Sequence, residues 1–180
     1  MSAVPKTAFF SSKRLYMVLG ASSNPQKFGN KVLKWYINRN LPVYPVNPTL
    51  ETVCGIKAYK TPNAILDTYL QDSKLRQTYP DGFSISVITS PTVSLTLLKS
   101  LHERIVEISG SAGDDGKEEI VRSIWFQPGS IDENVLQFVE ENYGLGAKDG
   151  SLIYSRPQKF ECILVGGDDR LRNEIPEHHL

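Results

Sequence analysis

The sequence predicts an α/β protein with one Rossmann-like, doubly wound, mostly parallel sheet of five or slightly more strands and helices on both faces. Two observations support this. Strand-like and helix-like segments alternate along the 180 residues. The strand-like segments are also almost wholly apolar or β-branched, which is typical of strands covered on both faces. We expect one domain over residues 14–165, because the chain shows no internal repeat and no linker.

The individual elements are marked by hydrophobic periodicity and by proline. Short apolar or β-branched runs predict strands over residues 14–20, 42–46, 83–89, 123–127, 151–155 and 160–165, with a short extended piece over 55–59. Apolar residues at helical spacing, or an opening proline, predict helices over residues 28–38, 63–70, from 91 onward and 131–142.

Four segments are predicted to lie outside this regular pattern. Residues 1–13 are expected to form an N-terminal arm and residues 166–180 a polar, partly ordered tail. Residues 70–82 and 109–119 resemble loop insertions, and the second of these is polar and glycine-rich, as mobile surface loops are.

Composition argues against several classes of protein. Hydrophobic residues make up 40% of the chain, and no apolar run approaches the roughly 20 residues of a membrane-spanning helix. Cys54 and Cys162 are far apart and form no C-x-x-C pair, so we expect neither a metal site nor a disulfide framework. This favours a reducing, cytoplasmic location. A mitochondrial location is the second choice, because the first residues are basic and free of acids.

Charge is divided unevenly along the chain. The first 50 residues contain seven Lys or Arg and no Asp or Glu, whereas the other 130 contain 13 basic and all 20 acidic residues. The two parts therefore carry +7 and −7. A basic region raises the local concentration of anions. Net neutrality, with no basic run longer than two residues, argues against tight binding of duplex nucleic acid.

The ends of the predicted strands carry the candidate site, because ligands of open parallel sheets lie outside the carboxyl ends of the strands. The segments that follow four of the strands are small, polar or proline-bearing: Gly20-Ala21-Ser22-Ser23-Asn24, Asn47-Pro48-Thr49, Thr89-Ser90-Pro91-Thr92 and Gln127-Pro128-Gly129. They present neither a nucleophile beside a base nor a pair of carboxylates. The sequence thus indicates binding, with no catalytic residue and no enzyme activity.

The first of these segments suits a phosphate group. Gly20 lets the backbone approach a ligand closely, the hydroxyls of Ser22 and Ser23 can donate hydrogen bonds, and the start of the next helix faces the anion. The alternative interpretation is ordinary turn chemistry with a helix cap, in an interaction or scaffold protein that retains only the fold.

Several motifs occur in order along the chain: residues 18–25 (VLGASSNP), 28–32 (FGNKV), 42–48 (PVYPVNP), 55–59 (GIKAY), 125–129 (WFQPG) and Cys162-Ile163. In these motifs the chain resembles the stand-alone CoA-binding domain family, which is similar to the N-terminal CoA-binding domain of the succinyl-CoA synthetase alpha subunit. The resemblance implies non-catalytic binding of coenzyme A or an acyl-CoA, a small-molecule nucleotide ligand. It identifies no protein partner.

The resemblance also implies which residues bind the cofactor. Phosphate is expected at the first turn, the nucleotide beside the end of the second strand, and the pantetheine arm beside the third. The full set is Gly20, Ala21, Ser22, Ser23, Asn24, Lys27, Gly29, Asn47, Pro48, Thr49, Tyr59, Thr89, Ser90 and Pro91. The chain departs from many family members after the third strand, where it has Ile88-Thr89 in place of a Phe-Arg pair.

NAD(P) binding, in a redox sensor or a dehydrogenase fragment, is the second functional hypothesis. Two features weigh against it. The chain has Gly20 and Gly29 but no G-x-G-x-x-G pattern. A carboxylate that would hold the ribose diol is also missing at the end of the second strand, where Asn47-Pro48 stands and Glu51 is the nearest acid.

Overall fold

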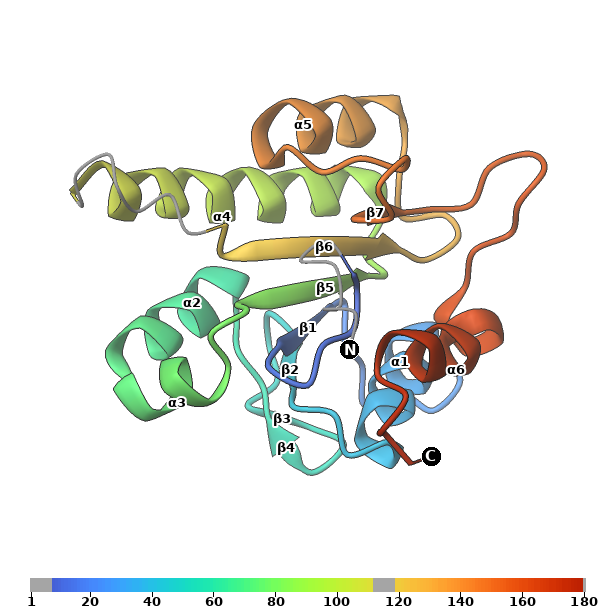
Figure 1. Ribbon diagram of the computed structural model, residues 1–180, viewed down its shortest axis with the longest axis horizontal. Coiled ribbons are helices and arrows are strands. Elements are labelled where there is room, and N and C mark those ends of the chain that lie inside the picture. The colour runs from blue at the N-terminus through green and yellow to red at the C-terminus, as the bar shows by residue number, and fades with distance from the viewer. Residues whose placement is uncertain (1–7, 112–118, 180) are drawn as a thin grey trace.

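A computed structural model describes residues 8–111 and 119–179 of the chain. Strands and helices alternate in it, as the sequence predicts (Figure 1). In chain order the elements are β1 (Leu15–Leu19), α1 (Phe28–Asn38), β2 (Val43–Val46), β3 (Thr52–Val53), β4 (Ile56–Lys57), α2 (Pro62–Gln71), α3 (Ser73–Thr78), β5 (Phe83–Val87), α4 (Pro91–Ser111), β6 (Val121–Phe126), α5 (Glu133–Tyr143), β7 (Leu152–Ile153) and α6 (Ile163–Glu174).

The main sheet has five strands in the order β2-β1-β5-β6-β7, and every neighbouring pair is parallel. Beyond β2, Tyr59 forms one further parallel bridge with Val46. With this bridge included, the order across the sheet is that of a dinucleotide-binding Rossmann sheet, 3-2-1-4-5-6. The predicted fold class is confirmed. Since the five strands of the main sheet run in the same direction, their carboxyl ends meet at one edge.

Helices cover both faces of the sheet and enclose two hydrophobic clusters. On one face Leu15, Met17 and Leu19 of β1 pack with residues of α2, α4 and α5. On the other face Tyr16 and Val18 pack with α1 and α6, which contact each other (Figure 1). The alternation of side chains along β1 divides the strand between the two clusters, as a doubly wound sheet requires.

The segment predicted as an insertion over residues 70–82 contains the end of α2 and the short helix α3. The Thr61 hydroxyl accepts a hydrogen bond from the Ala64 amide and caps α2, whose first residue is Pro62. The Asp72 carboxylate accepts one from the Leu75 amide and caps α3. Caps of this kind satisfy amides that have no partner within the helix. The two caps, together with hydrogen bonds of Asp81 with Ser11 and Lys13, order the chain between α2 and β5.

The strand predicted over residues 160–165 is wrong, as is the description of residues 166–180 as a partly ordered tail. Helix α6 begins at Ile163 and packs against α1 through Ile163, Gly167 and Leu171, which are spaced four residues apart. A Cβ atom on Gly167 would lie 2.6 Å from Cζ2 of Trp35, so the two helices are in close contact. The buried stripe is only one residue wide, and the apolar run Ile163-Leu164-Val165 at the start of the helix has the composition of a strand.

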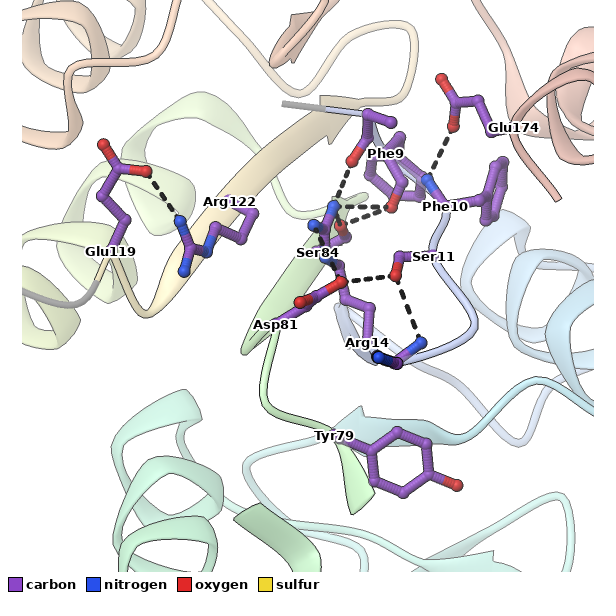
Figure 2. Close-up of polar contacts among 12 residues, drawn as sticks. Phe9, Phe10, Ser11, Arg14, Tyr79, Asp81, Ser84, Glu119, Arg122 and Glu174 are labelled. Carbon is purple, nitrogen blue, oxygen red and sulfur yellow. Dashed lines mark hydrogen bonds and ion pairs between the residues drawn. The ribbon is translucent and has the colours of Figure 1, made fainter. Parts of the chain in front are cut away.

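The predicted N-terminal arm is part of the core where the structure describes it. Phe9 and Phe10 are completely buried, and the Phe9 ring packs edge-on against Trp125 at 5.4 Å. The Arg14 guanidinium, also buried, donates to the Ala8 carbonyl and lies 4.0 Å from the Asp81 carboxylate. Figure 2 shows Arg14 in the same polar cluster as Phe9, Ser84 and Asp81. Desolvation by burial lowers the pKa of Arg14.

Helix α4 extends further than its apolar spacing predicts, to Ser111. The core of the predicted 109–119 loop, residues 112–118, lies outside the described residues. Neither α4 nor any other described helix is both long and apolar enough to cross a membrane.

Candidate functional site

The turn after β1 begins at Gly20, whose positive φ of 93° favours glycine. A Cβ atom at Gly20 would lie 3.1 Å from the Thr89 amide nitrogen, because β1 and β5 remain close where they end. The Ile88 amide donates to the Leu19 carbonyl at 2.9 Å. A side chain at position 20 would therefore strain the backbone and crowd the end of β5.

Residues 21–27 form a loop, the β1–α1 loop, that is held by its own polar groups. The Ser22 hydroxyl accepts a hydrogen bond from the Asn24 amide at 3.1 Å, and the Asn24 side-chain oxygen accepts one from the Gln26 amide at 2.9 Å. The Asn24 carbonyl accepts one from the Lys27 amide at 3.0 Å. Ser23, Asn24 and Lys27 are exposed. The loop is thus fixed in shape and open to solvent on its outer side.

Helix α1 starts immediately after this loop and presents an uncompensated N-terminus. Lys27 is its N-cap residue, makes no side-chain capping bond, and is followed by a first turn without an acidic residue. The Lys31 ammonium lies 5.7 Å from the Phe28 ring centroid, and no described carboxylate pairs with Lys27 or Lys31. The first amides of a helix carry partial positive charge. Together with two free lysines, they make this end of α1 attractive to an anion.

Gly29 brings the start of α1 against the end of β1. A Cβ atom on Gly29 would lie 2.0 Å from the Gly20 carbonyl oxygen, so only glycine fits at this position. Gly29 is buried. The structure therefore gives it a packing role, in which it holds the helix N-terminus close to the β1–α1 loop.

The end of β2 is joined to the same loop. The Asn47 side-chain amide donates to the Ala21 carbonyl at 2.9 Å, and the Ala21 amide donates to the Val46 carbonyl at 3.2 Å. Pro48 and Thr49 follow Asn47 on the surface. Beside them, Tyr59 donates from its amide to the Pro45 carbonyl, and its ring lies 5.8 Å from that of Tyr44. Burial is the main cause that raises the pKa of the Tyr44 hydroxyl, and the neighbouring Tyr59 raises it further, so Tyr44 stays neutral.

The end of β5 lies on the other side of the β1–α1 loop. The hydroxyls of Thr89 and the buried Ser94 are 2.7 Å apart, and the Ser90 carbonyl accepts a hydrogen bond from the Ser94 amide. Pro91 is the first residue of α4. The predicted set therefore converges on one edge of the sheet, with Gly20 between the ends of β2 and β5. The fourth predicted segment, Gln127-Pro128-Gly129, follows β6, one strand further along that edge.

Two residues outside the set predicted from the sequence, Asn30 and Cys54, pack against the inner side of the β1–α1 loop. The buried Asn30 side chain donates to the Ser22 carbonyl at 2.9 Å and lies 3.2 Å from the Cys54 sulfur. Cys54 is at the tip of the β3–β4 hairpin with a positive φ of 51°. Asn30 occurs within the motif at residues 28–32, but a polar side chain in a first helical turn usually indicates solvent exposure. Its contact with the hairpin joins two residues 24 positions apart, which no local sequence pattern reveals.

Among the described residues, no cluster of side chains suited to metal binding lies at this edge. Within them, no group of three or more histidine, cysteine or acidic side chains could hold a metal ion. A hollow lined by residues 140, 144–149 and 156 lies beside the loop between α5 and β7, and none of the predicted cofactor-binding residues lines it.

Comparison with known proteins gives a family and related folds. The model of the family described as CoA binding domain matches residues 14–154. No curated protein matches the chain. A conserved hypothetical protein from Pyrococcus furiosus is 25% identical, with a TM-score of 0.55 over 85% of this chain and 97% of that one. A hypothetical protein from Pyrococcus horikoshii OT3 is 22% identical, with a TM-score of 0.56 over 89% of this chain and 84% of that one, and shows the shared fold.

The family match covers the sheet and the whole carboxyl edge described above, from the residue before β1 to the one after β7. This chain belongs to the CoA-binding domain family.

Proposed function

We propose that the protein binds coenzyme A, free or acylated, at the carboxyl edge of its sheet and does not transform it. One observation carries the proposal: the β1–α1 loop is fixed by hydrogen bonds and leads into a helix N-terminus that has no side-chain cap and no acidic residue. Such a helix end binds phosphate through main-chain amides and the helix dipole. The other residues predicted to bind the cofactor, at the ends of β1, β2 and β5, supply the remaining contacts in this proposal.

CoA suits this site better than NAD(P) does. NAD sites place a carboxylate at the end of the second strand to hold the ribose diol. Here that position is Asn47, whose side-chain oxygen already accepts hydrogen bonds from the amides of Thr49 and Leu50. The surrounding charge is basic, which favours a ligand that carries an additional phosphate.

The groups at the edge support non-catalytic binding. The hydroxyls of Ser22 and Thr89 bond to neighbouring main-chain or hydroxyl groups, and no histidine or carboxylate is paired with them among the described residues. Acyl transfer requires a nucleophile with an adjacent base. The cytoplasm, with the mitochondrion as second choice, remains our proposed location on the cysteine pattern alone.

A titration of the purified protein with CoA and with NADH tests the binding proposal. A ligand that binds only the folded state stabilises it by about 2.7 kcal/mol at 100 times its dissociation constant. We expect CoA to raise the thermal midpoint and NADH to leave it nearly unchanged. A shift with NADH and none with CoA would show that the assignment is wrong.

Charge reversal at the helix N-terminus tests the location. Lys27→Glu should weaken CoA binding by about tenfold or more, because an acid then faces the phosphates. The same change should leave stability equal or raise it by about 0.3–1 kcal/mol, since acids favour helix N-termini. Lys34→Glu is the matched control: Lys34 is exposed on α1 about 10 Å further along the helix axis, a distance near the Debye length.

Incubation with acetyl-CoA and succinyl-CoA tests for turnover. Release of free thiol should equal that of a buffer blank. A protein-dependent rate that a single substitution at Ser22 or Cys54 abolishes would replace the binding role with an enzymatic one.

A further inference from the structure

We infer that Lys57 recognises the 3′-phosphate of the CoA ribose and thereby sets the preference for CoA over ligands that lack this phosphate. The inference rests on the proposed function and adds a specificity-determining residue to it. Lys57 lies on β4 and is not in the set predicted from the sequence.

The backbone places Lys57 beside the end of β2. Tyr59 bridges Val46, the last residue of β2, and its carbonyl accepts a hydrogen bond from the Asn47 amide at 2.9 Å. Two residues earlier, Lys57 pairs with Thr52 across the β3–β4 hairpin. The hairpin therefore lies next to the strand end where the ribose of a bound nucleotide is held in Rossmann sheets.

The side chain of Lys57 is positioned without being neutralised. Its ammonium nitrogen lies 5.0 Å from the centroid of the Tyr59 ring, a cation–π contact that keeps the charge beside the residue bridging the end of β2. Lys57 is exposed, and no carboxylate among the described residues forms an ion pair with it. Glu51 is the nearest acid in sequence; its carbonyl accepts a hydrogen bond from the Ala58 amide, and its side chain is exposed.

The chemistry of the ribose explains why a cation is needed there. A ribose with free hydroxyls is held by a carboxylate, whereas one that carries a phosphate requires a positive group at the same place. Asn47 offers no charge, and its oxygen is occupied by Thr49 and Leu50. Between residues 1 and 66, nine basic residues and the single acid Glu51 occur, so the field around this strand end is positive. Lys57 is held in this region by its contact with the ring of Tyr59, the residue that bridges the end of β2.

Binding of CoA and of dephospho-CoA, measured by calorimetry for wild type and variants, tests the inference. Wild type should bind CoA at least about fivefold more tightly than dephospho-CoA, and Lys57→Gln should lose that preference while its affinity for dephospho-CoA stays unchanged. The preference should also shrink as salt is raised. Lys34→Gln and Lys60→Gln are controls of equal charge change at exposed positions and should keep the preference.

The outcomes separate two kinds of failure. If wild type binds neither compound, the proposed function itself fails. If wild type prefers CoA and Lys57→Gln keeps the same ratio, or if Lys60→Gln removes it instead, CoA binding stands and the role of Lys57 is overturned. Circular dichroism of each variant confirms that the fold is intact.

Discussion

The β1–α1 loop and the N-terminal segment around Phe9 lie at opposite extremes of the same molecule. The outer side of the loop, residues 23–27, is exposed and is shaped by hydrogen bonds over two or three positions, such as Asn24 to Ser22, while Asn47 and Asn30 tie the inner side to β2 and α1. The N-terminal segment is buried and is held by contacts across most of the chain: the Phe10 amide donates to the Glu174 carboxylate at 2.7 Å (Figure 2). Local hydrogen bonds shape the exposed side of the candidate binding surface. Contacts between residues far apart in the sequence hold the N-terminal segment in the core.

This difference separates binding from stability. A residue in the loop makes few buried contacts, so its loss costs little folding energy and affects the ligand directly. A residue in the N-terminal segment excludes water from the core, and its loss costs stability without touching the ligand. Each substitution below measures one side of that division, and the expected effects decrease from the first to the last.

Replacing a phenylalanine in each region gives the largest contrast. Phe9→Ala should destabilise the protein by about 3–5 kcal/mol, because the ring is fully buried between Trp125 and Tyr16. Phe28→Ala, at a side chain that is 55% exposed beside the loop, should change stability by less than about 1 kcal/mol. Urea denaturation measures both. If Phe9→Ala and Phe28→Ala lost equal free energies of unfolding, the two regions would not differ in their contribution to stability.

Gly29 is the position where the two properties are coupled. Gly29→Ala should cost about 1–3 kcal/mol of stability and more than tenfold in CoA affinity, because its Cβ would collide with the Gly20 carbonyl and displace the loop. Gly166→Ala, within α6 and with no atom near the new Cβ, should instead stabilise the protein by roughly 0.5–1 kcal/mol. Denaturation measures the stability of both variants, and calorimetry measures their affinity for CoA. Unchanged CoA affinity in Gly29→Ala would show that the β1–α1 loop does not take part in binding.

Ser22 tests the loop alone. Its oxygen accepts from the Asn24 amide, which leaves the hydroxyl proton available for a phosphate. Ser22→Ala should reduce CoA affinity by about tenfold, the lower end expected for a hydrogen bond to a charged group, while stability changes by less than about 1 kcal/mol. Ser22→Thr retains the hydroxyl and should bind nearly as well as wild type. A stability loss larger than the affinity loss would contradict the division.

The ion pair between α1 and α6 should give the smallest effect. Arg39 forms two hydrogen bonds to Asp168, at 2.6 and 2.9 Å, and these chiefly hold the pKa of Asp168 below its ordinary value of 3.8. A carboxyl with a lowered folded-state pKa stabilises the protein above its unfolded pKa and loses this effect as pH falls. Asp168 is 39% exposed, so Asp168→Asn should cost only about 0.5–1 kcal/mol at pH 7. Denaturation at about pH 2–3 should show that difference disappearing; a constant difference would rule out the ion pair as its cause.

Sequence reasoning succeeded where the signal is local. Helix α1 was predicted to the residue, since its apolar positions recur at helical spacing, and the Gly20 turn follows directly from an apolar run that stops at a glycine. It failed for α6, where a glycine takes a buried position and the first residues, Ile163-Leu164-Val165, form an apolar run like that of a strand. It also failed for Phe9, whose partner Trp125 is more than a hundred residues away.

The candidate site divides in the same way. The loop and strand-end residues were predictable because a parallel sheet gathers its carboxyl ends at one edge. The supporting role of Asn30 and the position of Lys57 were not, because both depend on where the β3–β4 hairpin packs. Two short strands of two residues each carry almost no periodic signal.

A crystal structure of the protein with bound CoA tests the central claim most directly. The proposal predicts the diphosphate against the main-chain amides of Ser22 and Ser23 and the start of α1, with the nucleotide beside Asn47 and Tyr59. Density for CoA in the hollow between α5 and β7, or at any place that leaves the β1–α1 loop without a phosphate, would contradict it.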